Sequence, residues 1–226
     1  MTTAKHSKAR DLRQIFLVDD HPMMREGLSQ LISQEKDLAV CGEAEDVAAA
    51  LQQIEKLKPD LVLADVSLRT SNGLDLIKDL KLRAPSVAVL VISMHDESLY
   101  AERVLRAGAR GYIMKQEGGS RLMQAIRQVL EGGTYVSEKI SARILDWFSG
   151  RPSQDASPVG KLSDRELQVF QLLGEGLSTK QVAAQLHVSP KTVEVHRVNI
   201  KQKLGLGTAP ELIRAAVRWV ESQNTR

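Results

Sequence analysis

The chain has 226 residues, which is enough for two modest domains or one large domain. Hydrophobic residues make up 42% and charged residues 26% of the sequence, so the composition is globular and excludes a disordered or fibrous chain. The single cysteine excludes an intrachain disulfide, and no apolar run approaches the ~20 residues that a membrane-spanning helix needs. We therefore expect a cytoplasmic protein without a membrane partner.

Charge is unevenly distributed along the chain, although the formal net charge is only +3. Residues 12–130 contain 15 Lys and Arg against 17 Asp and Glu, whereas residues 160–226 contain 10 against 6. A basic C-terminal third favours a polyanion as the partner of that segment. A difference of this size does not decide the question without further evidence.

Five short apolar runs are spaced along the first half of the chain. They lie at 15–18, 38–41, 61–64, 87–92 and 109–114. Runs of this length without polar alternation are typical of strands that are buried on both faces. Between and after them, apolar residues recur at helical spacing in 22–35, 46–57, 73–82, 97–107 and 119–130. Five strands alternating with five helices predict an α/β fold with a doubly wound, five-stranded parallel sheet.

The pattern changes after residue 148. Residues 149–160, SGRPSQDASPVG, are rich in Ser, Pro and Gly and have no periodicity, which predicts a linker, while 137–148 before them can form a short helix. Beyond the linker we predict only helices, at 164–175, 179–186, 190–204 and 209–222. Ser163 with Glu166 forms a capping box, and Ser189 before a proline marks another helix start.

Polar side chains directly follow four of the predicted strands. They are Asp19, Asp20, Asp65, Ser93 and Lys115. Because ligands of a doubly wound sheet bind beyond the carboxyl ends of its strands, we expect these groups to share one crevice. Converging carboxylates favour Mg²⁺, and with a lysine and a hydroxyl they can hold a phosphoryl group for attack. Each residue alone could be a helix cap or a surface group. Their joint occurrence at four strand ends favours a site.

Residues 12–130 resemble the receiver domain of two-component response regulators. The resemblance rests on LVDDH at 17–21, LADVSL at 63–68 with Gly73 following, VISMH at 91–95 and GYIMK at 111–115. It implies a flavodoxin-like fold in which Asp65 is the phosphoacceptor. It also implies the roles of the surrounding residues: Mg²⁺ held by Asp19, Asp20, Asp65 and the main-chain carbonyl of Ser67, phosphoryl contacts from Lys115 and Ser93, and a change of rotamer at Tyr112 when Ser93 moves.

Two positions depart from the family pattern. Arg69, four residues after Asp65, and Gln116, directly after Lys115, stand where the family often has proline. Neither change removes a reacting atom. They leave open the loop conformation at Arg69, the cis peptide expected after Lys115, and the rates of phosphorylation and hydrolysis.

Residues 179–204 combine a helix, a short turn at 187–189 and a second helix. An apolar set that includes Val182, Val193 and Val195 can lock the two helices together. The second helix carries basic residues along its length. This pattern is typical of a recognition helix, in which N-terminal residues contact base edges and basic residues contact phosphates.

The stretch 162–220 resembles the LuxR-type helix-turn-helix of the NarL/FixJ class of regulators. The resemblance rests on LSDRELQVFQLLGEG followed by STKQVAAQLHVSPKTVEVHRVNIKQKLG. It implies base-edge contacts by Glu194, Val195 and Val198. The residues expected to contact phosphates are Lys180, Lys191, Thr192 and Lys201, with His196 and Arg197 as further candidates. Glu194 replaces a basic residue of some members; it can accept a hydrogen bond from cytosine N4 or face solvent.

Together the two resemblances predict a receiver domain at 13–131, a linker that can hold a short helix at 132–160, and a smaller, all-α, four-helix helix-turn-helix domain at 161–224. The implied function is that of a phosphorylation-controlled transcriptional regulator and not of an enzyme. The implied partners are a sensor histidine kinase, Mg²⁺ and double-stranded promoter DNA. RNA polymerase is a further candidate partner, and a homodimer is expected upon phosphorylation.

Two other functions stay open at this point. A haloacid-dehalogenase-like phosphatase would also use paired aspartates, a hydroxyl and a lysine, but its aspartates alternate as D-x-D, whereas here they are adjacent. The second alternative is a regulator whose receiver fold does not respond to phosphorylation, and the complete acidic site argues against it. The sequence leaves the kinase, the signal, the operator and the sign of regulation open.

Overall fold

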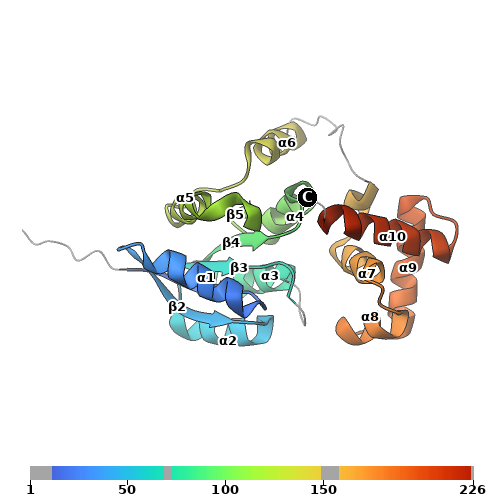
Figure 1. Ribbon diagram of the computed structural model, residues 1–226, viewed down its shortest axis with the longest axis horizontal. Coiled ribbons are helices and arrows are strands. Elements are labelled where there is room, and N and C mark those ends of the chain that lie inside the picture. The colour runs from blue at the N-terminus through green and yellow to red at the C-terminus, as the bar shows by residue number, and fades with distance from the viewer. Residues whose placement is uncertain (1–11, 69–72, 149–157, 225–226) are drawn as a thin grey trace, which may run out of the picture. The chain divides into compact units, whose positions relative to one another are not determined.

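The computed structural model describes residues 12–68, 73–148 and 158–224 (Figure 1). The chain divides after residue 137 into two compact units, except that residues 95–103 group with the second unit. Among the helices of these described ranges, none is long and apolar enough to span a membrane.

The first unit is built on a five-stranded sheet in which all paired strands are parallel. The strands are β1 (Arg13–Val18), β2 (Leu38–Ala44), β3 (Leu61–Ala64), β4 (Ala88–Ser93) and β5 (Gly111–Met114). Their order across the sheet is β2-β1-β3-β4-β5. This order is that of a flavodoxin-like doubly wound sheet, so the predicted fold class is confirmed.

A helix follows each strand of the sheet. The helices are α1 (Pro22–Ser33), α2 (Val47–Leu57), α3 (Gly73–Arg83), α4 (Glu97–Ala107) and α5 (Gly118–Leu130) (Figure 1). Apolar residues of α1 and α5, such as Ile32 and Ile126, join alternate sheet residues such as Leu17 and Leu63 in one buried cluster. Alternate residues of a strand point to the same face of the sheet, so α1 and α5 cover the face that carries this cluster. Helices α2 and α3 contact each other and contribute no residue to the cluster.

The last strand is shorter than the apolar run predicted. It begins at Gly111 and not at Ala109. Gly108 has a φ of +125°, a conformation that glycine adopts without strain, and the N–H of Ala109 still bonds back to the carbonyl of Val104. The chain is therefore still leaving α4 where the run begins, and the strand starts two residues later.

The second unit contains the C-terminal helices. They are α6 (Glu138–Phe148), the short 3₁₀ helix η2 (Pro158–Lys161), α7 (Asp164–Gly174), α8 (Thr179–Gln185), α9 (Pro190–Leu204) and α10 (Ala209–Asn224). The four helices predicted after the linker are confirmed as α7 to α10, and α6 lies in the segment that can form a short helix. Residues 149–157 of the predicted linker lie outside the described residues.

Local caps explain why these helices begin where they do. Ser163 and Glu166 form the predicted capping box at the start of α7, and the Ser189 hydroxyl accepts the N–H of Thr192 at 3.0 Å at the start of α9. At the other end of α9, Gly205 takes the left-handed conformation with a φ of +66°. The two helices of the helix-turn-helix are thus fixed by short-range signals as well as by packing.

Candidate functional site

The register of the sheet brings the polar strand ends together. Val18 of β1 lies opposite Ala64 of β3, and Asp19 and Asp65 are the next residues on these two strands. Strand β1 lies between β2 and β3, at the point where the strand order reverses. Ligands of doubly wound sheets bind at this switch point, so the paired strands place their acidic groups where this fold binds ligands.

The polar side chains of this site are buried, and burying a charged group costs free energy unless it is paired. Asp19, Asp20, Asp65 and Ser93 are 1%, 7%, 3% and 0% exposed. Lys115, the residue that follows β5, provides a positive charge: its Nζ donates to Asp19 Oδ2 at 2.6 Å and to Asp65 Oδ2 at 2.7 Å. One ammonium therefore bridges two buried carboxylates, which is the kind of pairing that buried charges require.

Asp65 and Lys115 respond differently to their shared environment. Burial raises the pKa of the Asp65 carboxyl, and the charge and hydrogen bond of Lys115 only partly offset this effect. Burial acts to lower the pKa of Lys115, but the charges and hydrogen bonds of Asp65 and Asp19 outweigh it and raise the pKa. Lys115 thus stays a cation, while the surroundings of Asp65 favour its ionised form less than water does.

Short-range contacts hold the acidic loop in place. The N–H of His21 donates to Asp19 Oδ1 at 2.8 Å, and Arg25 Nη1 donates to the carbonyl of Asp19 at 2.7 Å. The N–H of Ser67 donates to Asp65 Oδ1 at 3.0 Å. Sequence reasoning missed Arg25. Its place one turn into α1, the helix that follows the acidic pair, is the signal that could have indicated it.

Gly73 has a steric reason to follow the acidic strand end. A Cβ atom at this position would lie 2.3 Å from the carbonyl oxygen of Asp65. No real side chain tolerates such a contact with backbone, so glycine lets the start of α3 approach the loop after β3.

Strand β5 and the turn after it carry two further positions that the receiver resemblance singled out, Tyr112 and the peptide bond after Lys115. Tyr112 is 1% exposed in β5. The described residues contain no cis peptide, so the bond between Lys115 and Gln116 is trans, and Lys115–Glu117 form the 3₁₀ helix η1. Arg69 lies outside the described residues.

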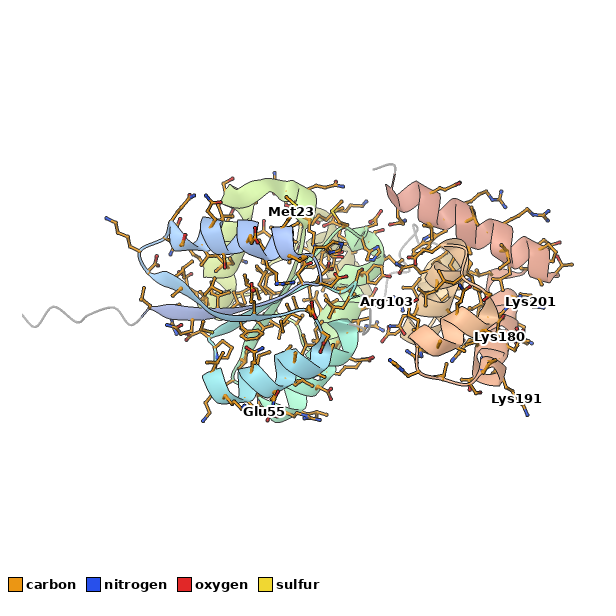
Figure 2. The ribbon with its side chains drawn as sticks, turned by 60° about the horizontal axis from the view of Figure 1, so that its bottom comes forward. Met23, Glu55, Arg103, Lys180, Lys191 and Lys201 are labelled. Atoms are coloured by element: carbon orange, nitrogen blue, oxygen red, sulfur yellow. The ribbon has the colours of Figure 1, made fainter. Side chains whose placement is uncertain are left out.

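The predicted DNA contacts are carried by α8 and α9, on the part of the molecule where Figure 2 labels Lys180, Lys191 and Lys201. The exposed members of the predicted set are Lys180, Lys191, Thr192, Glu194, Val195 and Val198, whereas His196, Arg197 and Lys201 are half-buried. Residues 191, 194, 195, 198 and 201 follow helical spacing and share one face of α9.

One expectation about this helix pair was wrong. Val195 does not help to lock the helices together, because it is 53% exposed. Val182 and Val193 are fully buried and fill that role. Val195 therefore lies on the free face of α9 beside Val198, which is 46% exposed.

Sequence reasoning missed Thr179, the first residue of α8. Its Oγ1 lies 2.9 Å from Glu194 Oε1 and 2.6 Å from Arg197 Nη1. The contact joins two helices across a sequence separation that no periodic pattern reports. Nδ1 of His196 is enclosed by protein and has no hydrogen-bond partner among the described residues, which sets this residue apart from the exposed candidates.

Comparisons with known proteins agree with the two units. A family model described as "Response regulator receiver domain" matches residues 15–127, and one described as "Bacterial regulatory proteins, luxR family" matches residues 160–216. The oxygen regulatory protein NreC of Staphylococcus aureus is 36% identical over 210 residues, covering 91% of this chain and 97% of NreC. The transcriptional regulatory protein DegU of Brevibacillus brevis is 31% identical over 224 residues, covering 92% and 95%.

A solved structure is similar to this chain over most of its length. RcsB of Salmonella enterica serovar Typhimurium, bound to promoter rprA in the presence of the phosphomimetic BeF₃⁻, is 25% identical. It covers 90% of this chain and 98% of its own, with a TM-score of 0.68.

Proposed function

Because the chain belongs to the response regulators that join a receiver domain to a LuxR-type helix-turn-helix domain, it is a transcriptional regulator of this class, and we propose that Asp65 is its phosphoacceptor. The observation that carries the proposal is the pairing of Lys115 Nζ with both Asp65 and Asp19 at the carboxyl ends of the strands. Family membership favours the regulator over the phosphatase.

The chemistry proposed at Asp65 is the capture of a phosphoryl group from a sensor histidine kinase. A carboxylate oxygen of Asp65 attacks phosphorus, the phosphorus–nitrogen bond of the kinase phosphohistidine breaks, and the imidazole leaves with a proton. Lys115 would stay near the new phosphoryl oxygens because its positive charge is retained. Ser93, at the end of β4, would offer them a hydroxyl, and Tyr112 on the neighbouring strand would follow its movement. Positioning and electrostatics are the main contributions that phosphoryl transfer needs from a protein.

The donor set of this site fits Mg²⁺. Ligand atoms of Asp19, Asp20 and Asp65 lie within 4.8 Å of one another, and carboxylate oxygens are the ligands that Mg²⁺ prefers. These three carboxylates and the main-chain carbonyl of Ser67 would hold the ion. When bound, Mg²⁺ supplies positive charge that offsets the carboxylates and the phosphoryl oxygens.

The proposed output is promoter binding by the C-terminal helix-turn-helix. We assign residues 13–131 to the receiver domain, 132–160 to a linker and 161–224 to the DNA-binding domain. Phosphorylation would favour a homodimer, since two tethered DNA-binding domains gain avidity on paired half-sites. Lys180, Lys191, Thr192 and Lys201 would contact phosphates, with His196 and Arg197 as further candidates, and RNA polymerase would be a partner at the promoter.

The test compares Asp65→Asn with Asp75→Asn, an identical chemical change at an exposed site on α3. Each protein is incubated with acetyl phosphate and MgCl₂, labelling is measured by mass spectrometry, and DNA binding is measured by genome-wide mapping. We expect Asp65→Asn to lose labelling and phosphate-stimulated binding while Asp75→Asn retains both. Full labelling of Asp65→Asn would refute the site assignment. Labelling without any change in DNA binding would instead favour a regulator that ignores phosphorylation.

A further inference from the structure

A carboxylate lies on the face of α9 that is proposed to enter DNA. Glu194 shares this face with Lys191, Val195 and Val198, and 54% of its side chain is exposed. Phosphates repel a carboxylate, so a glutamate here weakens non-specific binding. Its presence calls for a favourable contact within the groove that outweighs this repulsion.

Glu194 is held in a closed network of three side chains. Its Oε1 accepts from Thr179 Oγ1 at 2.9 Å and from Arg197 Nη1 at 2.8 Å, and Arg197 Nη1 also lies 2.6 Å from Thr179 Oγ1. Thr179 belongs to α8 and the other two belong to α9, so the network crosses between the helices. Only 18% of the Arg197 side chain is exposed. The Glu194 carboxylate is therefore held in one orientation by contacts from both α8 and α9.

The network leaves one carboxylate oxygen for a ligand. Both hydrogen bonds end on Oε1, and Oε2 has no hydrogen bond among the residues that the structure describes. A free carboxylate oxygen in the major groove accepts from an exocyclic amine. Cytosine offers such a donor at N4. Adenine offers its donor beside the N7 acceptor, which repels a carboxylate, so cytosine suits Glu194 better.

The apolar neighbours of Glu194 point to the adjacent base. Val195 and Val198 are 53% and 46% exposed on the same face of α9, although water disfavours exposed aliphatic groups. The thymine C5 methyl is the apolar group that the major groove presents. A carboxylate next to two valines therefore matches a cytosine next to a thymine.

We propose that Glu194, positioned by Thr179 and Arg197, selects a cytosine in each half-site, next to a thymine that Val195 contacts. This inference rests on the proposed function, in which α9 enters the major groove. Thr179 is a positioning residue: it does not touch the base but keeps Oε2 of Glu194 directed into the groove.

The experiment selects sequences from a pool of random DNA duplexes with the full chain, treated with acetyl phosphate. The variants are Glu194→Gln, Thr179→Val and the control Glu175→Gln, which makes the same change at an exposed residue outside α9. The wild-type protein should prefer cytosine at one position of each half-site by about 10-fold over other bases. Glu194→Gln should move that preference to adenine, because an amide pairs with N6 and N7 together. Thr179→Val should keep cytosine with a weaker preference, and Glu175→Gln should match the wild type.

The outcomes separate this inference from the proposed function. Enrichment of a motif that Glu194→Gln does not change at any position would overturn the role of Glu194. An unchanged preference in Thr179→Val, with a thermal melting curve like that of the wild type, would overturn its positioning role. Failure of the wild-type protein to enrich any sequence would count against the proposed function itself.

Discussion

Two carboxylates, one in each unit, have similarly low solvent exposure, yet their pKa values shift in opposite directions. Asp65 is 3% exposed and Glu166 is 4% exposed. Burial raises the pKa of Asp65, and Lys115 compensates only in part. Burial also acts to raise the pKa of Glu166, but hydrogen bonds from Lys203 and Ser163 outweigh it, and the pKa is lowered. Low exposure of a side chain therefore does not set the direction of its pKa shift, because Asp65 lies deeper among protein atoms than Glu166 does.

The arrangement of the partners also differs between the two carboxylates. Glu166 accepts from the N–H of Ser163 at 2.8 Å and from Lys203 Nζ at 2.6 Å, and it shares these donors with no other carboxylate among the described residues. Asp65 shares one lysine with Asp19. The C-terminal unit uses its buried carboxylate to hold a helix start, whereas the receiver unit gathers more negative charge than it neutralises. Such an excess is what a site for a cation and a transferable group requires.

The largest expected effect comes from removing the lysine that two carboxylates share. Lys115→Met leaves Asp19 and Asp65 buried without a cation, and breaking a buried pair in this way costs about 3–5 kcal/mol. Urea unfolding at neutral pH, followed by circular dichroism, should show this loss. Lys56→Met, an exposed change on α2, serves as the control and should unfold like the wild type. A loss as small as that of the control would show that the acidic cluster does not depend on Lys115.

A smaller effect is expected when the satisfied carboxylate is neutralised. Glu166→Gln should lower the free energy of unfolding by about 1.5 kcal/mol at neutral pH, less than a fully buried charged bond because Lys203 is partly solvated. Because the folded pKa of Glu166 is lowered, its contribution is present above the ordinary value of 4.5 and is lost as the pH falls through the folded value. The gap between wild type and variant, measured by urea unfolding across this range, should therefore close in acid. A gap that widens in acid would contradict the assigned direction.

Two kinds of contact could be predicted from the sequence: contacts between near neighbours in the chain, and contacts that parallel strands impose at their ends. The capping box of Ser163 and Glu166 is a local signal, and the structure forms it as expected. The strand-end residues Asp19, Asp65 and Lys115 are far apart in the sequence, yet parallel strands must place their carboxyl ends at one edge. Both the helix starts and the meeting of these groups followed from patterns in the chain.

Contacts between elements without such a rule could not be predicted. Thr179 meets Glu194 because α8 and α9 cross at a particular angle, which no spacing encodes. Lys203, at the far end of α9, reaches Glu166 because α9 also packs against α7, and no spacing encodes that contact either. Val195 was assigned to the helix interface because its apolar character fits a core as well as a groove, and only packing decided between them.

Asp65→Asn should have the opposite sign from Glu166→Gln. A raised pKa means that the folded protein binds the proton of Asp65 more tightly than the unfolded chain does, so the ionised carboxylate lowers stability above its folded pKa. Replacing it with a neutral amide should raise the free energy of unfolding at neutral pH, since Lys115 keeps Asp19 as a partner. The gain should vanish as the pH falls to the ordinary value of 3.8 and below, where both side chains are neutral. If Asp65→Asn is instead less stable than wild type at neutral pH, pairing with Lys115 dominates over burial.

The smallest effect is expected at a cluster with the same charges but little burial. Arg127 of α5 pairs with Glu35 and Asp37, one cation between two carboxylates, as Lys115 lies between Asp19 and Asp65. The Arg127 side chain is 41% exposed, so water solvates the two carboxylates once the cation is removed. Arg127→Met should therefore cost less than about 1 kcal/mol, and the cost should shrink further in high salt. Urea unfolding at two salt concentrations measures both quantities. A loss equal to that of Lys115→Met would mean that the number of charges, and not their burial, sets the stability of these clusters.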